Sequence, residues 1–271
     1  MSGTRPGSIW RAAPRRGLLR VGIGLLTGLV VAAVLVVAYA VAVEPRWVAV
    51  RTVRLSDRPS LRLIHITDLH YKGDRAYIER VVRHINAIPA DVLCFTGDLI
   101  EDTRYLTEAL SLLSQVRRPM YGVRGNHDAL DGGDLACLQA RFEASGGRWL
   151  TDERVSLLDG RLEIFGSSGR LRLIAPTVSS GPGHHLLLVH DPAVIEHLSG
   201  VHFDVILAGH THGPQLRIPG GGPLLDLPLV GGYKRGLYQT PAGPLYVNPG
   251  LGTFYAPIRF GCRPEITVIE L

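Results

Sequence analysis

Five short apolar runs in this chain each end abruptly in Asp, Asn or His, and this pattern constrains the fold more than any other feature. Short apolar runs bounded by Gly, Pro and polar residues are typical of strands buried on both faces. Carboxylates and imidazoles at the ends of such strands indicate an active site along one edge of a sheet. The five runs are Leu63–Thr67, Val92–Thr96, Tyr121–Val123, Leu186–Val189 and Val205–Ala208.

The side chains that follow these runs carry the donor atoms that proteins use to hold metal ions. One Asn-His pair in a loop is more often a turn than a site, so the recurrence at five strand ends is the informative observation. Mixed imidazole and carboxylate donors suit Mn, Fe, Zn or Ni better than Ca or Mg. The side chains of this kind at the five strand ends are Asp68, His70, Asp98, Asn126, His127, His190, Asp191, His210 and His212.

The third run leads into Gly125-Asn126-His127-Asp128, which adds two residues of a different kind. Gly125 lets the backbone turn sharply after the strand. Asn126 and His127 carry side chains able to hold a metal or a phosphate, and Asp128 can orient His127 by accepting its ring proton.

The net charge of +5 comes from the amino-terminal part of the chain. Residues 1–60 hold nine Arg and two acids, so the remaining residues hold 20 basic and 22 acidic side chains. A folded part with a net charge of −2 argues against a nucleic-acid partner. Three scattered cysteines argue against a disulfide framework and against a Cys-based zinc site.

The chain divides by composition into four parts. Residues 21–43 are 23 residues without a charge, long enough to cross a bilayer as a helix. Residues 1–20 form a basic tail, 44–60 a connector with a first strand at Trp47–Val53, and 61–271 the main domain. The Arg excess ahead of the apolar stretch favours a cytoplasmic amino terminus, a single-pass cell-membrane protein and an extracytoplasmic domain.

A cleaved signal peptide is the alternative to a retained anchor. Arg15-Arg16 resembles a twin-arginine export signal, and Ala38-Tyr39-Ala40 or Ala40-Val41-Ala42 offers a cleavage site. The apolar stretch is long for a cleaved signal, which favours the anchor. Both alternatives place the domain outside the cytoplasm.

From residue 61 onward, strand patterns alternate with helix patterns. Helical spacing of apolar residues predicts helices at Tyr77–Ile88 and Leu106–Val116, a weaker one at 134–145, and a short one near 192–198. Further short strands are predicted at Val155–Leu158 and Leu162–Phe165, and in the Gly- and Pro-rich part from 215 onward. The fold class is therefore α/β, with helices outside two sheets in a layered α/β/β/α sandwich.

These motifs together resemble those of the calcineurin-like metallophosphoesterases, in the same order and at the same strand ends, over residues 61–271. The finer resemblance is to membrane-linked bacterial phosphoesterases of that superfamily. It rests on Gly209 to Gln215 and on the tail from Gly250 to Ile266.

The resemblance implies a dinuclear metal centre. Asp68, His70 and His212 would hold one divalent ion, Asn126, His190 and His210 the other, and Asp98 would bridge them. A metal-bound hydroxide would then attack a phosphate ester, with His127 stabilising charge or protonating the leaving oxygen. Asp128 would orient His127, so these two are the candidate catalytic residues.

One segment departs from this pattern, and the position of a second segment is left open. Gly166–Gly169 and a compact 170–184 replace a longer helical segment of the relatives, which leaves the substrate-facing wall undefined. The Leu-rich loop 219–232 either forms an apolar lip beside the metals or packs on its own domain.

The favoured function is hydrolysis of a phosphodiester or a lipid-linked phosphate at the membrane surface. A nuclease or nucleotide phosphatase on the same site is the alternative within enzymes. A non-enzymatic, metal-stabilised scaffold is the alternative outside them, and it is disfavoured because all the expected ligands and His127 are present. The sequence leaves the substrate, the metals and the oligomeric state open.

Overall fold

The computed structural model describes residues 15–128, 130, 132–168, 182–217, 222, 232–254 and 256–271. The chain forms two compact units, Met1–Tyr39 and Ala40–Leu271. The first contains helix α1 (Arg15–Ala38), and Leu19–Arg46 is long and apolar enough to cross a membrane, with none of its most apolar window buried. This helix suggests a single-pass membrane protein.

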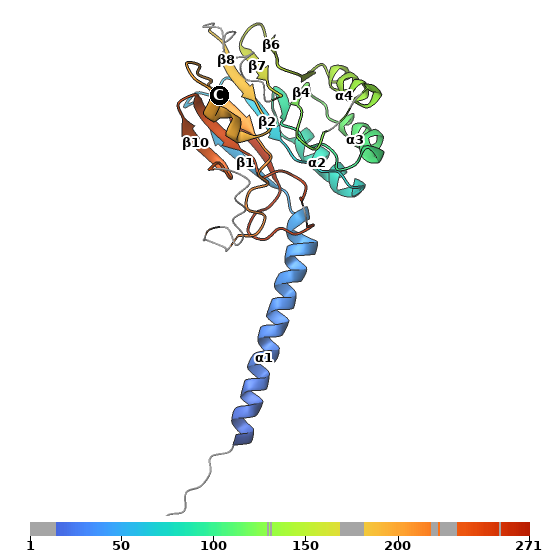
Figure 1. Ribbon diagram of the computed structural model, residues 1–271, viewed down its shortest axis with the longest axis vertical. Coiled ribbons are helices and arrows are strands. Elements are labelled where there is room, and N and C mark those ends of the chain that lie inside the picture. The colour runs from blue at the N-terminus through green and yellow to red at the C-terminus, as the bar shows by residue number, and fades with distance from the viewer. Residues whose placement is uncertain are drawn as a thin grey trace, which may run out of the picture. The chain divides into compact units, whose positions relative to one another are not determined.

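The second unit contains two six-stranded sheets (Figure 1). The first sheet has the order β1 (Ala49–Arg54), β12 (Glu265–Glu270), β2 (Arg62–Ile66), β3 (Val92–Phe95), β4 (Met120–Val123) and β5 (Arg148–Leu150). The second has the order β10 (Gly236–Thr240), β11 (Gly243–Val247), β9 (Val205–Ala208), β8 (His184–Leu188), β7 (Leu162–Gly166) and β6 (Glu153–Leu157).

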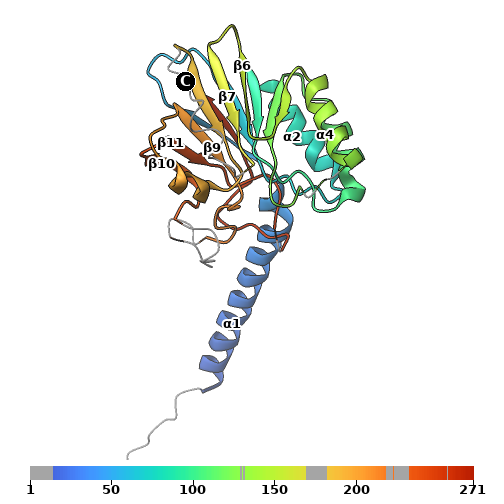
Figure 2. The same cartoon turned by 45° about the horizontal axis from the view of Figure 1, so that its top comes forward.

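The helices of the second unit are α2 (Arg75–Ala87), α3 (Leu106–Leu113) and α4 (Gly132–Ala144), which lie together on one side of the first sheet (Figure 2). Short helical turns occur at η1 (Tyr39–Val43), η2 (Glu44–Arg46), η3 (Thr103–Tyr105) and η6 (Pro192–His197). The predicted helix near 192–198 is η6, a 3-10 helix that begins at the Asp191 cap.

Alternate residues of the strands face different cores, which explains why the strand sequences are continuously apolar. Leu63 of β2 and Leu186 of β8 meet in the core between the two sheets. Their neighbours point the other way: Ile64 packs in the core under the helices, and Leu187 packs with Ile195 of η6 outside the second sheet. The layered α/β fold predicted from the sequence is therefore confirmed.

The carboxyl ends of β2, β3 and β4, which are mutually parallel, lie at one edge of the first sheet. In the second sheet β8 and β9 are also parallel. The loops that follow these five strands hold the candidate ligands, and the parallel pairing brings the loops to a common edge within each sheet. The predicted loop 219–232 lies outside the described residues except for Gly222 and Gly232, and most of 170–184 is likewise outside them.

Candidate metal centre

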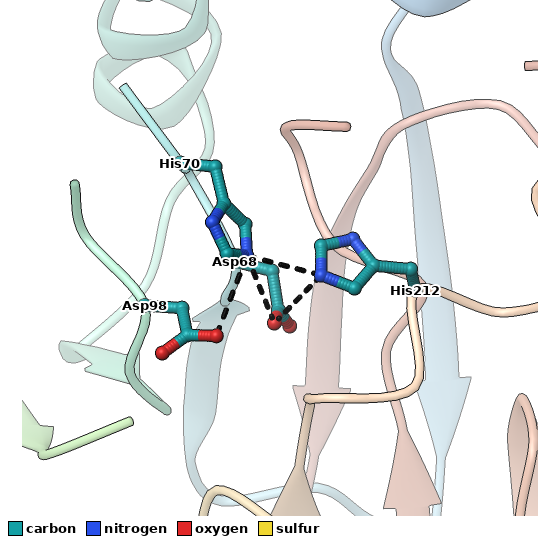
Figure 3. Close-up of side chains that lie close together, drawn as sticks. All are labelled: Asp68, His70, Asp98 and His212. Carbon is teal, nitrogen blue, oxygen red and sulfur yellow. Dashed lines mark hydrogen bonds and ion pairs between the residues drawn. The ribbon is translucent and has the colours of Figure 1, made fainter. Parts of the chain in front are cut away.

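The seven predicted ligands converge in two groups that share Asp98. In the first group, one donor atom from each of Asp68, His70, Asp98 and His212 lies within 4.8 Å of every other (Figure 3). In the second group the same holds for Asp98, His190 and His210. The side chains of Asp68, His70, Asp98, His190 and His212 are buried, whereas His210 is half-buried and Asn126 exposed. The first group therefore lies within the protein, and the second reaches the surface.

In the first group, the imidazole of His70 lies between two carboxylates. Its Nε2 atom is 3.3 Å from Oδ2 of Asp98 and 3.8 Å from Oδ1 of Asp68. The same Nε2 atom lies 3.0 Å from Nε2 of His212, which is itself 3.4 Å from Oδ1 of Asp68. Four donor atoms therefore surround one small volume.

In the second group, the side-chain oxygen of Asn126 is the common neighbour of two imidazoles. Asn126 Oδ1 lies 2.8 Å from Nε2 of His190 and 2.9 Å from Nδ1 of His210, and these two nitrogens are 3.1 Å apart. Nε2 of His190 is also 3.3 Å from Oδ2 of Asp98. Oδ2 of Asp98 is thus equally distant from an imidazole of each group, which is the position a bridging ligand needs.

Two contacts outside these groups determine which imidazole nitrogen faces inward. Nδ1 of His190 donates to the carbonyl oxygen of Thr96 at 2.7 Å, which leaves Nε2 for the second group. Nδ1 of His70 donates to Oε2 of Glu101 at 2.7 Å, which leaves Nε2 for the first group. Such outer hydrogen bonds are typical of metal-binding histidines. Glu101 was not predicted as a site residue, although it follows Asp98 by three positions.

His127 lies beside the first group. Its ring is 5.0 Å from the ring of His70, and its backbone N–H donates to Oδ1 of Asp98 at 2.8 Å. The residue is half-buried, so part of it faces solvent. His127 therefore sits next to both the predicted ligands and solvent.

Asp128 is placed differently from our prediction that it orients His127. Its Oδ2 accepts the backbone N–H groups of Asp98 and Gly125, at 2.8 and 3.0 Å, and its Oδ1 accepts that of Leu99 at 2.8 Å. Burial raises the pKa of Asp128, and the same three amides oppose that rise. The correction has a physical reason: two tight loops leave backbone N–H groups that must be satisfied. Asp128 ties the β3 and β4 loops together.

Phe254 is a further site residue that the sequence analysis missed. Its ring lies 4.9 Å from that of His127 and 5.6 Å from those of His70 and His212, and it is stacked on His212. An aromatic ring in contact with three imidazoles closes one side of the centre. A cavity of about 380 Å³ adjoins the second group and is lined by residues that include Asn126, His190, Arg124 and Ser168.

Strained backbone is concentrated in the site. Eight non-glycine residues of the described chain have φ in the left-handed region, and five of them are predicted ligands. This conformation is costly for residues with a side chain and is found mainly where function requires it. The five are Asp68, His70, Asp98, His210 and His212, with φ between 40° and 68°.

Glycines permit the close approach of these loops. A Cβ atom on Gly125 would collide with the carboxylate of Asp98, and one on Gly209 would collide with that of Asp68. These two glycines precede the Asn126 and His210 loops, so their small size lets the loops reach the carboxylates.

The carboxylates dominate the electrostatics of the site. Burial lowers the pKa of His70, but Asp68 and Asp98 outweigh burial and raise that pKa to about 10. Burial also lowers the pKa of His190, but Asp98 and Asp68 outweigh this effect and raise that pKa to about 9. For His212 burial prevails and lowers the pKa to about 3. The site therefore attracts positive charge, as protons or as metal ions.

The donor set fits metal ions better than it fits a hydrogen-bonded core. The two facing nitrogen pairs, His70 with His212 and His190 with His210, can each share only one proton. Among the described residues, the buried Oδ1 of Asp68 has no hydrogen-bond partner. A buried oxygen without a donor is costly, and a cation would satisfy it.

A comparison with known protein families agrees with this geometry. The family model for calcineurin-like phosphoesterases matches residues 61–214, more than half of the chain. The chain belongs to this family. Calcineurin-like phosphoesterases are hydrolases of phosphoric ester bonds, so the protein is a metallophosphoesterase, as the sequence motifs predicted.

Three relatives illustrate the family. The uncharacterized metallophosphoesterase YkoQ of Bacillus subtilis is 30% identical over 80% of this chain and 86% of its own length. The phosphodiesterase YaeI of Escherichia coli is 26% identical over 84% of this chain and 90% of its own length. The UDP-2,3-diacylglucosamine pyrophosphatase LpxG of Chlamydia trachomatis is 26% identical over 78% of this chain and 83% of its own length. The metallophosphoesterase thus has relatives named for phosphodiester and diphosphate cleavage.

Proposed function

We propose that this metallophosphoesterase is a membrane-anchored, dinuclear metal-dependent enzyme that hydrolyses a phosphodiester or a lipid-linked phosphate. One observation carries the dinuclear assignment. Oδ2 of Asp98 lies 3.3 Å from Nε2 of His70 and 3.3 Å from Nε2 of His190, between two otherwise separate sets of donors.

The residues that would hold the two divalent ions follow from the two groups. Asp68, His70 and His212 would bind one ion, Asn126, His190 and His210 the other, and Asp98 both. Mn, Fe, Zn or Ni would suit these donors. Such a pair of ions supplies charge to hold the phosphate and a nucleophile at neutral pH.

The protein's own residues supply the rest of the chemistry. His127 is beside the first group and half-exposed, so its ring can donate a proton to the leaving oxygen or stabilise charge on the phosphate. Asp128 holds the loop that presents His127. Phe254 packs on His127 and His212 and so helps to hold their rings in place.

The cavity supports a substrate whose phosphate carries two substituents. A monoester needs room for one leaving group, whereas the cavity of about 380 Å³ beside Asn126 and His190 can hold a second substituent. Its lining combines the exposed Arg124, which suits an anionic group, with the apolar side chains of Val189 and Val194. A lipid-linked phosphate is also supported by the name of LpxG, whose substrate carries acyl chains.

The localisation we propose is single-pass in the cell membrane, with residues 1–20 cytoplasmic and the catalytic domain outside. The apolar helix supports the anchor, and the Arg residues that precede it support the orientation. Retention of the helix, rather than its cleavage as a signal peptide, is part of the same proposal.

The test is metal content and activity of the full chain, purified in detergent and loaded with each of the four metals. We expect close to two ions per chain, and hydrolysis of bis-p-nitrophenyl phosphate in preference to p-nitrophenyl phosphate. Asp98→Asn should lose most of one ion together with activity. Asp102→Asn, an exposed carboxylate four residues away, is the matched control. A single ion in the active parent protein would refute the dinuclear assignment.

A substrate panel separates the proposed substrates from the alternatives. Single-stranded DNA and a nucleotide test for a nuclease or nucleotide phosphatase, and a chromogenic phospholipid ester in vesicles tests for a lipid-linked phosphate. Faster hydrolysis of DNA than of the other substrates would favour the nuclease.

A further inference from the structure

The segment that follows the apolar helix, Ala40–Val48, belongs to the same compact unit as the metal site. Ala40 and Glu44 are 6% and 2% exposed. The backbone N–H of Arg259 donates to the carbonyl of Ala40 at 2.9 Å, and that of Cys262 donates to Oε1 of Glu44 at 2.6 Å. The chain therefore leaves this unit, toward the apolar helix, at one defined point.

This exit point is joined to the loop over the metal site. The fully buried guanidinium of Arg259 donates to the carbonyls of Pro249, Gly250 and Gly252. The N–H of Gly252 donates in turn to the carbonyl of Asp68 at 2.6 Å. A continuous set of hydrogen bonds thus connects the exit point to a predicted metal ligand, and the same loop carries Phe254 onto the site histidines.

An exposed aromatic side chain lies next to the exit point. Trp47 is 51% exposed, and the guanidinium of Arg263 lies 3.9 Å from the centre of its ring. Arg263 also donates to the carbonyls of Trp47 and Val48, at 2.8 and 2.9 Å. The indole is thus held in place by a cation while much of it faces outward, an arrangement that leaves apolar surface available to a partner.

The other exposed side chains near Trp47 are of two complementary kinds. Val43 is apolar and 48% exposed. Arg46 is exposed, and its ion pair with Asp74 is solvent-exposed, so it is weak and leaves guanidinium N–H groups for other partners. Indole and guanidinium groups at the end of an apolar span are the side chains that the headgroup region of a bilayer accommodates.

We propose that Val43, Arg46, Trp47 and Arg263, together with the exposed loop residues Ala256 and Pro257, form a membrane-docking surface. The partner is the headgroup region of the bilayer that the apolar helix crosses. Guanidinium groups bind lipid phosphates, and the indole occupies the boundary between headgroups and acyl chains. This inference rests on the proposed membrane anchoring.

Docking determines how the substrate arrives. Because the loop that carries Phe254 is part of the docking surface, the first ligand group, on which Phe254 packs, lies toward the bilayer, whereas the cavity is lined by Asn126 and His190 of the second group. A substrate anchored in the same leaflet reaches the two ligand groups at the rim of the docked face, beside Phe254, and places its polar part in the cavity. A substrate dissolved in water has no such advantage.

The test uses the full chain reconstituted in phosphatidylcholine vesicles that contain a lipid with a nitroxide on its headgroup. In a Trp10→Phe background, Trp47 and the buried Trp149 are the two remaining tryptophans. We expect the nitroxide to quench part of the emission, and Trp47→Phe to abolish that quenched part. Emission from Trp149 reports that each variant is folded.

Two inserted tryptophans then locate the docked face, in the variant that lacks both Trp10 and Trp47. Ala256→Trp on the loop should be quenched. Arg161→Trp, an exposed position directly before β7 and thus at the opposite edge of its sheet from the site, is the matched control and should not be quenched. Equal quenching at both positions, or quenching at neither, would overturn the docking surface.

Hydrolysis of bis-p-nitrophenyl phosphate, measured on the same vesicles, keeps the two proposals separable. Active protein without quenching at Trp47 and Ala256→Trp would overturn the docking surface and leave the proposed function standing. Quenched but inactive protein would overturn the proposed function alone.

Discussion

Nδ1 of His70 lies 2.7 Å from a carboxylate oxygen of Glu101, and this contact determines which nitrogen of His70 faces Asp68 and Asp98. Replacing the carboxylate in Glu101→Gln weakens the acceptor for the Nδ1 proton. We expect metal affinity to fall about 10- to 100-fold, the usual effect of losing such an outer partner. Competition with a chelator measures this.

Glu108→Gln is the matched control for Glu101→Gln. Glu108 is a carboxylate on α3 that pairs with Arg75 at 3.4 Å, away from the imidazoles. Equal metal affinities for the two variants would mean that Glu101 does not position His70.

His127 is expected to act on the phosphate without binding metal. His127→Ala should therefore retain both ions while kcat falls by about 100-fold or more, the scale associated with a lost proton donor or charge stabiliser. Elemental analysis and steady-state kinetics on the same preparation check both parts. A variant that lost an ion would show instead that His127 is a ligand.

His65 should make the protein less stable in mild acid. Burial lowers the pKa of His65 to about 3, against a smaller opposing effect of Asp68, so the folded protein keeps this ring neutral. Below pH 6.5 the unfolded chain binds a proton that the folded chain does not, and stability is lost as the pH falls from 6.5 toward 3. The loss from this residue alone is roughly 2 kcal/mol at about pH 5.

The variant that checks this is His65→Gln, whose amide can still bond to Thr96 but does not titrate. Its stability should fall less between pH 7 and pH 5 than that of the parent, as measured by denaturant unfolding of the full chain in detergent. The exposed His84→Gln variant is the matched control. Parallel pH curves for parent and His65→Gln would contradict the prediction.

The orientation in the membrane can be tested on intact cells. Five Arg precede the apolar stretch and four follow it before residue 60, and three of the leading five lie close to it, at 15, 16 and 20. With a cytoplasmic amino terminus, protease added to spheroplasts should degrade the phosphoesterase domain. Protection until lysis would reverse the orientation and move the substrate to the cytoplasmic leaflet.

The parts of this protein that could be predicted from sequence are those encoded locally. The apolar run before Asp98 predicts β3, and the spacing of Ile78, Val81 and Ile85 predicts α2, because each pattern is complete within a few residues. The layered fold followed from the alternation of such patterns. The convergence of the candidate ligands also followed, since strand ends meet at a sheet edge.

The remaining features depend on contacts between distant residues. Phe254 contacts His127, which comes more than one hundred residues earlier in the sequence. No local sequence pattern distinguishes Phe254 from an ordinary aromatic residue in a loop. The role of Asp128 was misjudged because its three backbone partners are set by how the β3 and β4 loops meet. Arg259 is buried and surrounded by carbonyl groups. No sequence pattern predicts this burial, because nothing distinguishes Arg259 from the other Arg residues of the chain.

The pairing of β1, β12 and β2 has a consequence for biosynthesis. β12 (Glu265–Glu270) follows all the other strands that the structure describes, yet it lies between β1 and β2, pairing Ala49 with Glu265 and Leu63 with Ile269. The first sheet therefore stays divided until β12 has been synthesised. A nascent chain that has already produced its apolar helix and every candidate ligand still has an open edge at β2 until then.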